Sequence, residues 1–149
     1  MRQIAALLVL ALCAVAPAFA QTTGNLPLVG VLRINTPENV EPFPTIFRDA
    51  LAALGQVDGR NIRIELRLAE GHAERFPELA QALVREKASV IVTSGDAATR
   101  AAQQATETIP IVALADDLVA SELIKSLAKP GGNTTGVSIL ARELDVEAA

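Results

Sequence analysis

Strand-like and helix-like patterns alternate along this chain, and the alternation limits the folds open to it. Apolar residues run almost unbroken through residues 28–34, as in a parallel strand covered on both faces. Phe43, Phe47 and Leu51 then recur at a helical spacing. Similar segments follow, separated by short loops. We expect strands at residues 28–34, 62–68, 89–93, 109–114 and 135–139, and helices at residues 43–54, 76–84, 98–105 and 123–127.

This order predicts an open α/β fold built on a parallel sheet of about five strands. Residues 62–68 alternate strictly between apolar and charged side chains, so one face of this strand meets water. Such a strand belongs at an edge of the sheet, and the strand order 2-1-3-4-5 places it there. The fifth strand then lies at the opposite edge.

The first twenty residues have the pattern of a secretory signal peptide. Arg2 gives a positive start, residues 4–15 form an apolar run, and small residues precede a cleavage position before Gln21. The apolar run is shorter than the roughly 20 residues that a membrane span needs. A lipoprotein anchor on Cys13 is the alternative, but Leu12 stands where such an anchor has a small residue. We therefore expect a secreted or periplasmic protein.

The composition of the mature chain argues against a nucleic-acid-binding protein and against a disulfide-stabilised one. Without residues 1–20 the chain has 12 Lys and Arg against 17 Asp and Glu, a net charge of −5. A nucleic-acid-binding protein needs a basic surface to neutralise phosphates, and this chain has no basic stripe. Cys13 is the single cysteine, so the mature protein has no disulfide and its stability depends on its apolar core.

A ligand site is expected where the strand order reverses, beyond the carboxyl ends of the first and third strands. The loops there contain hydroxyl, amide and carboxylate groups. The loop after the third strand leads straight into a helix, and the first N–H groups of a helix have no partner within the helix. The candidate ligand-binding residues are Asn35, Thr36, Ser94, Gly95, Asp96, Ala97 and Asp116.

Each candidate also has a purely structural interpretation. Asp96 directly precedes a helical pattern, where a carboxylate is a good N-cap. Asn35 and Thr36 either shape the loop before Pro37 or contact a ligand. Asp116 is expected to be a solvated loop or cap residue rather than a ligand contact. Arg33 is expected to pair with a nearby carboxylate rather than with a ligand.

Catalysis and cofactor binding find little support in the sequence. It has no glycine-rich phosphate motif, so a nucleotide is not expected. His72 is the single histidine, and with no cysteine in the mature chain a metal-ligand set is not expected either. Ser94 lacks the flanking glycines of a nucleophile elbow. We therefore predict no cofactor and no enzymatic activity.

Residues 109–138, IPIVALADDLVASELIKSLAKPGGNTTGVS, closely resemble a segment of the bacterial ABC-transporter substrate-binding proteins that include tryptophan- and aromatic-amino-acid-binding members. The family pattern is an I-P-I-V strand followed by D-P-V-x-x-G-L-V-x-S-L-A-x-P-G-G-N-x-T-G. Residues 54–84 are also similar to this family. Two positions depart from the pattern: Leu118 replaces its proline and Glu122 replaces its glycine.

The resemblance implies a flavodoxin-like or Rossmann-like lobe of a type I periplasmic binding protein. Such a protein holds a small molecule between two lobes and delivers it to a membrane permease. An amino acid would suit the site, and a monomer is expected. The implied organisation is a signal peptide at residues 1–20, a polar leader at 21–27, the amino-terminal lobe at 28–140 and the start of a truncated inter-lobe helix at 141–149.

Other classes share this fold. A signalling receiver needs an acidic pair after the first strand, but Asn35 and Thr36 stand there. A flavodoxin-like redox domain commonly stacks aromatic side chains on its cofactor, and this chain has no Tyr or Trp. A secreted hydrolase using Ser94 is the third alternative. The signal peptide argues against the first two of these classes.

Overall fold

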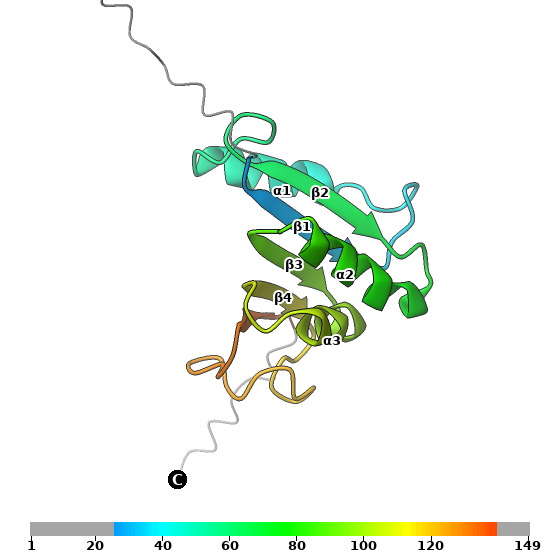
Figure 1. Cartoon of the computed structure of the whole chain (residues 1–149), viewed down its shortest axis with the longest axis vertical. Helices are drawn as coiled ribbons and strands as arrows, with labels where there is room; N and C mark the ends of the chain where they lie inside the picture. Colours follow the sequence, from blue (N-terminus) through cyan, green and yellow to red (C-terminus); the bar gives the residue numbers. More distant parts are fainter. Residues whose placement is uncertain (1–25, 140–149) are drawn as a thin grey trace, which may run out of the picture.

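A parallel sheet with helices on both faces forms the body of the protein (Figure 1). The computed structural model describes residues 26–139. The predictions for the signal peptide, for Cys13 and for residues 141–149 lie outside this range. The elements in chain order are β1 (Leu28–Arg33), α1 (Phe43–Ala53), β2 (Arg63–Leu68), the 3-10 turn η1 (Ala73–Arg75), α2 (Phe76–Arg85), β3 (Val90–Ser94), α3 (Asp96–Ala105), β4 (Ile111–Ala115) and β5 (Thr134–Ser138).

The strand order is β2-β1-β3-β4-β5 and every pairing is parallel, which confirms the predicted topology. β2 lies at one edge, as its alternating pattern predicts. Strand bounds differ from the expected ones by one or two residues. The largest consequence is that Ser94 ends β3 instead of following it.

The two faces of the sheet are covered differently. α1 packs its Phe43, Phe47 and Leu51 side chains against residues of β1 and β2. α2 and α3 cover the opposite face, where Leu83 of α2 is fully buried. α2 approaches β1 so closely that a Cβ on Gly30 would lie 2.6 Å from a Leu83 methyl carbon. Because α1 and α3 leave the sheet on opposite sides, their connecting loops diverge at the carboxyl edge.

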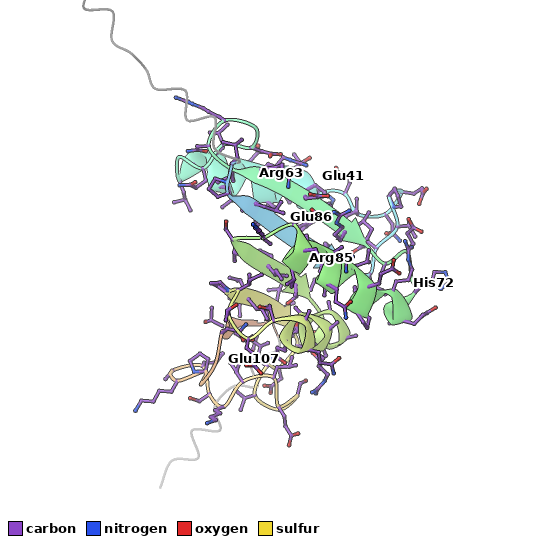
Figure 2. All side chains as sticks on the ribbon, viewed as in Figure 1. Glu41, Arg63, His72, Arg85, Glu86 and Glu107 are labelled. Carbon is purple, nitrogen blue, oxygen red and sulfur yellow. The ribbon has the colours of Figure 1, made fainter. Side chains whose placement is uncertain are left out.

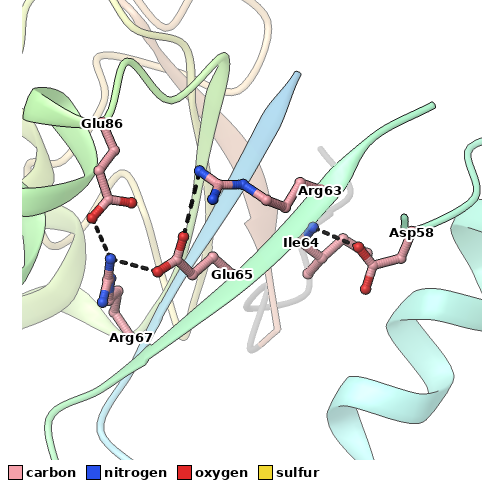
Figure 3. A network of polar contacts seen from close by, with 6 residues as sticks. All are labelled: Asp58, Arg63, Ile64, Glu65, Arg67 and Glu86. Atoms are coloured by element: carbon pink, nitrogen blue, oxygen red, sulfur yellow. Dashed lines mark hydrogen bonds and ion pairs between the residues drawn. The ribbon is translucent and has the colours of Figure 1, made fainter. Parts of the chain in front are cut away.

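The charged side of the edge strand is joined to α2 by ion pairs (Figure 3). Arg67 contacts Glu65 on its own strand and Glu86 at the end of α2, with both N–O distances at 2.5 Å. Before the strand, the carboxylate of Asp58 accepts a hydrogen bond from the Ile64 N–H at 2.8 Å. These contacts pair the charged ends of the β2 side chains, although the Nε of Arg67 is buried without a hydrogen-bond partner among the described residues.

The helix expected at residues 123–127 is absent from the described structure, and this prediction is wrong. After Asp117 the chain makes one helical turn, which Glu122 ends in the left-handed conformation at φ 56°. The Leu123 N–H donates to the Leu118 carbonyl at 2.9 Å and the Glu122 N–H to that of Val119 at 3.0 Å, as in a Schellman motif. Leu123 and Ile124 still pack over β4 from this turn, so their apolar spacing reflects burial in a turn and not in a helix.

Candidate functional site

A hollow of about 330 Å³ lies at the carboxyl edge of the sheet, at the position predicted from the strand order. Its volume is at the lower end of the range for small-molecule sites. The ends of β1, β3, β4 and β5 all contribute to it. The lining residues are Ile34, Ser94, Gly95, Asp96, Leu114, Ala115, Asp116 and Ile139.

The corner between β3 and α3 lines this hollow with Ser94, Gly95 and Asp96. Gly95 is the N-cap residue, and its φ of 89° is a conformation that favours glycine. Asp96 is the first residue of α3, and no side chain makes a capping hydrogen bond. The prediction that Asp96 is the N-cap is therefore wrong. Its carboxylate is left beside the hollow, next to a helix N-terminus that attracts anions.

The two aspartates after β4 have different roles. The Asp117 carboxylate accepts hydrogen bonds from the N–H groups of Val119 and Ala120 at 3.0 and 2.9 Å, so it stabilises the turn. Asp116 is exposed and lines the hollow. Among residues 26–139 it has no side-chain hydrogen bond or ion pair. Of the two carboxylates, that of Asp116 is the one available to a ligand.

The loop after β1 uses its polar groups internally. Asn35 donates from Nδ2 to the Asn39 carbonyl at 3.2 Å, and the Thr36 N–H donates to Asn39 Oδ1 at 2.8 Å. Neither Asn35 nor Thr36 lines the hollow, and Ala97, although in the first turn of α3, does not line it either. In this structure Asn35 and Thr36 therefore shape the loop that contains Pro37.

Arg33, the last residue of β1, makes no ion pair within the described part of the chain, so the expected pairing with a carboxylate is wrong. Its Nε donates to Asn35 Oδ1 at 3.0 Å, and its guanidinium carbon lies 4.0 Å from the centre of the Phe43 ring. This is the geometry of a cation–π contact. Partial burial lowers the pKa of Arg33, because desolvation disfavours the charged form.

The apolar part of the lining was not among the predicted site residues. Ile34, Leu114 and Ile139 provide this wall, and each lies at or just beyond the carboxyl end of a strand. Their position at the ends of strands is the signal in the sequence that could have identified them. The mixed lining suits a ligand with an apolar part and charged groups.

The described residues show no arrangement for hydrolysis or metal binding. His72 is exposed in the loop after β2, with its side chain at the molecular surface (Figure 2), and its Nδ1 lies 3.1 Å from Glu74 Oε1. No hydrogen bond joins it to Ser94 within residues 26–139. In the same range, no group of three or more His, Cys, Asp or Glu side chains is placed to hold a metal ion.

A larger hollow, of about 520 Å³, lies between the turn after β4 and the loop before β5. Gln103 projects into this region, but its amide already donates to the Leu123 carbonyl at 2.7 Å and to Thr134 Oγ1 at 3.0 Å. Gln103 thus holds the two segments on α3, and the Asn133 amide, also in the lining, donates to the carbonyls of Thr106 and Ile109. The smaller hollow at the carboxyl edge is the better candidate for a ligand.

Comparison with known proteins shows the family of this chain. A model of the family described as ABC transporter substrate binding protein matches residues 40–148. The chain belongs to this family. None of the helices within residues 26–139 has the length and apolar character to cross a membrane.

Three relatives illustrate the family. A tyrosine-binding protein of Clostridioides difficile (strain R20291) is 32% identical over 111 residues, which are 74% of this chain and 32% of the relative. The ligand-free, open structure of a substrate binding protein with adhesive properties from Clostridium difficile matches with 30% identity and a TM-score of 0.69. An ABC domain in complex with L-Trp from Streptococcus pneumonia matches with 27% identity and a TM-score of 0.65.

These matches cover only part of each relative. Each of the two solved structures is matched over 76% of this chain and 39% of its own length. The chain therefore spans about a third of the curated relative and two fifths of the solved ones. The relatives hold far more chain than the single sheet described above.

Proposed function

We propose that this chain is the amino-terminal lobe of an extracytoplasmic solute-binding protein that serves an ABC importer and binds an amino acid at the carboxyl edge of its sheet. The hollow between the β3–α3 corner and the loop after β4 supports the site. The family membership and the tyrosine- and tryptophan-binding relatives support the ligand class. The partner in the membrane is the permease, and the second lobe closes over the ligand.

The chemistry of an amino acid fits the lining of the hollow. Its ammonium is attracted by the carboxylates of Asp96, at the start of α3, and Asp116, in the loop after β4, which both line the hollow. Its carboxylate suits the unpaired N–H groups at the start of α3, since a helix N-terminus carries partial positive charge. An aromatic side chain is accommodated by Ile34, Leu114 and Ile139. The observation that carries the proposal is this combination of opposite charges beside an apolar wall.

Ligand fluorescence gives a direct assay, because the chain has no Trp or Tyr of its own. The anisotropy of L-tryptophan or L-tyrosine emission should rise as the protein is added. Asp116→Asn should weaken binding by about tenfold, the effect of one charge-assisted hydrogen bond. Its unfolding free energy should hardly change.

Asp117→Ala is the matched control. It removes a carboxylate one residue away that stabilises a turn, so it should cost about 1 kcal/mol of stability and leave affinity almost unchanged. If neither amino acid shows a rise in anisotropy with the wild-type protein, an amino acid ligand for this lobe is wrong. If both variants lose affinity equally, Asp116 has no specific role.

A further inference from the structure

The guanidinium of Arg33 is held in a fixed position but has no anionic partner. Asn35 accepts from its Nε, and the Phe43 ring lies against its plane. The orientation of Asn35 is itself fixed by the hydrogen bond from its Nδ2 to the Asn39 carbonyl. Within residues 26–139, the two Nη groups of Arg33 make no hydrogen bond and no ion pair.

Such an arrangement is unusual for a partly buried cation. Removing a charge from water is unfavourable unless a partner compensates for the lost hydration. Burial lowers the pKa of Arg33 in the same sense. The chain has a net negative charge, yet no described carboxylate lies within ion-pair distance of this side chain. The Nη atoms of Arg33 are not among the buried unpaired atoms of residues 26–139, so they remain accessible to an anion from outside the lobe.

The position of Arg33 also relates it to the proposed site. Leu32 pairs in register with Thr93, which puts Arg33 level with Ser94 at the carboxyl end of the neighbouring strand. Alternate residues of β1 and β3, among them Val31 and Val92, belong to the cluster on the α1 face, and Arg33 continues that series. Arg33 does not itself line the hollow of about 330 Å³, but it lies level with Ser94, which does, on the side of the sheet that α1 covers.

We propose that Arg33 is a ligand-contacting residue whose free Nη groups receive the carboxylate of the bound amino acid together with the N–H groups at the start of α3, and that Asn35 is the residue that positions Arg33. This inference rests on the proposed function and extends it. Asn35 and Thr36 then act through the shape of their loop, and the contact from β1 is made by its last residue. A guanidinium fork matches a carboxylate better than a lysine ammonium does, because both N–H groups can donate in parallel.

Tryptamine tests this assignment, since it is tryptophan without the carboxylate. The wild-type chain should bind L-tryptophan more tightly than tryptamine in the anisotropy assay. Arg33→Gln should weaken L-tryptophan binding by about tenfold or more and leave tryptamine binding unchanged. Asn35→Ala should give a smaller loss with the same selectivity, because the guanidinium remains but is less well oriented.

Two control variants separate this contact from other effects. Arg60→Gln removes the same charge from an exposed loop before β2, so it should change neither affinity. Arg33→Lys keeps the charge and the aliphatic stem, and should bind L-tryptophan with intermediate affinity. Circular dichroism at the assay temperature establishes that each variant is folded, and Arg33→Lys carries the test should Arg33→Gln be unfolded.

The affinities of the variants for L-tryptophan and tryptamine distinguish a role of Arg33 in carboxylate binding from a general effect. A loss for L-tryptophan alone supports the contact. An equal loss for both ligands, or no loss beyond that of Arg60→Gln, overturns the role of Arg33 and leaves the proposed function intact. If the wild-type chain binds neither ligand, the proposed function fails and the role of Arg33 fails with it.

Discussion

Two buried threonines beside the corner between β3 and α3 allow a quantitative prediction of stability. Thr93 and Thr99 are 1% and 0% exposed, and their Oγ1 atoms lie 2.8 Å apart. Thr99 Oγ1 also lies 2.9 Å from the Gly95 carbonyl, which can only accept. The single hydroxyl hydrogen of Thr99 therefore goes to Gly95. Thr93 must be the donor in the bond between the two threonines.

This order makes the two single substitutions unequal. Thr99→Val removes the acceptor and leaves the buried Thr93 hydroxyl without a partner, at a cost of about 2 kcal/mol. Thr93→Val removes the donor but leaves Thr99 bound to Gly95, at a cost of about 1 kcal/mol. In the double variant no donor is stranded, and the Gly95 carbonyl still accepts from the Thr99 N–H at 3.1 Å. The double variant should therefore cost about 1 to 2 kcal/mol less than the sum of the single ones.

Urea denaturation followed by circular dichroism measures all four proteins of this cycle. The transition midpoints should fall in the order wild type, Thr93→Val, Thr99→Val, with similar slopes. If Thr93→Val proves as costly as Thr99→Val, the donor assignment is wrong. Strictly additive costs would mean that the two hydroxyls are not coupled, contrary to the 2.8 Å contact.

Three further substitutions test other parts of the structure. Glu122→Gly should raise the unfolding free energy by about 0.5 to 1 kcal/mol, because glycine adopts the left-handed conformation without strain. This gain exceeds the cost of the greater freedom that glycine gives the unfolded chain. Glu122→Ala should give no gain in the same urea titration. Gly136→Ala should lower the unfolding free energy by about 3 kcal/mol or more, because the added Cβ would lie 1.9 Å from a β4 carbonyl oxygen. Gly132→Ala is the control: its Cβ would have no atom within 4 Å, so its unfolding free energy should stay within about 0.5 kcal/mol of wild type. For Asp58, partial burial by itself raises the pKa, but the hydrogen bonds from the Ile64 N–H and Arg48 outweigh it and the net pKa is lowered. The contribution of Asp58 to stability is therefore complete above about pH 4, and it is lost as the pH falls through the lowered pKa of the folded protein. Asp58→Asn should thus lose less stability than wild type between about pH 6 and pH 3. An unchanged pH dependence of the urea midpoint would contradict this.

The sequence alone determined the topology of the sheet. The alternating pattern of residues 62–68 identified an edge strand, and the continuous apolar runs identified covered ones. With right-handed crossovers these patterns leave few arrangements. The place of the candidate hollow followed from the same order, because parallel strands bring their carboxyl ends to one edge. These features depend on local periodicity, which a sequence displays directly.

Details within the loops depended on tertiary contacts. The spacing of Leu123 and Ile124 suits a helix or a buried turn equally well over so short a stretch, and the left-handed conformation of Glu122 selects the turn. The resemblance had placed a glycine at that position, which was the available signal. Asp96 is the first residue of α3 and not its cap, because Gly95 turns the chain one residue earlier.

The partner of Arg33 is the clearest case of a decision made only in three dimensions. From the sequence, a carboxylate was the expected partner of an arginine in an acidic chain. The structure instead places the Phe43 ring against the guanidinium and Asn35 at its Nε. Phe43 lies ten positions further along the chain and reaches Arg33 only because α1 packs on the same face of the sheet. Periodicity fixes which face a residue occupies, but a contact between side chains from different elements is set by how those elements pack.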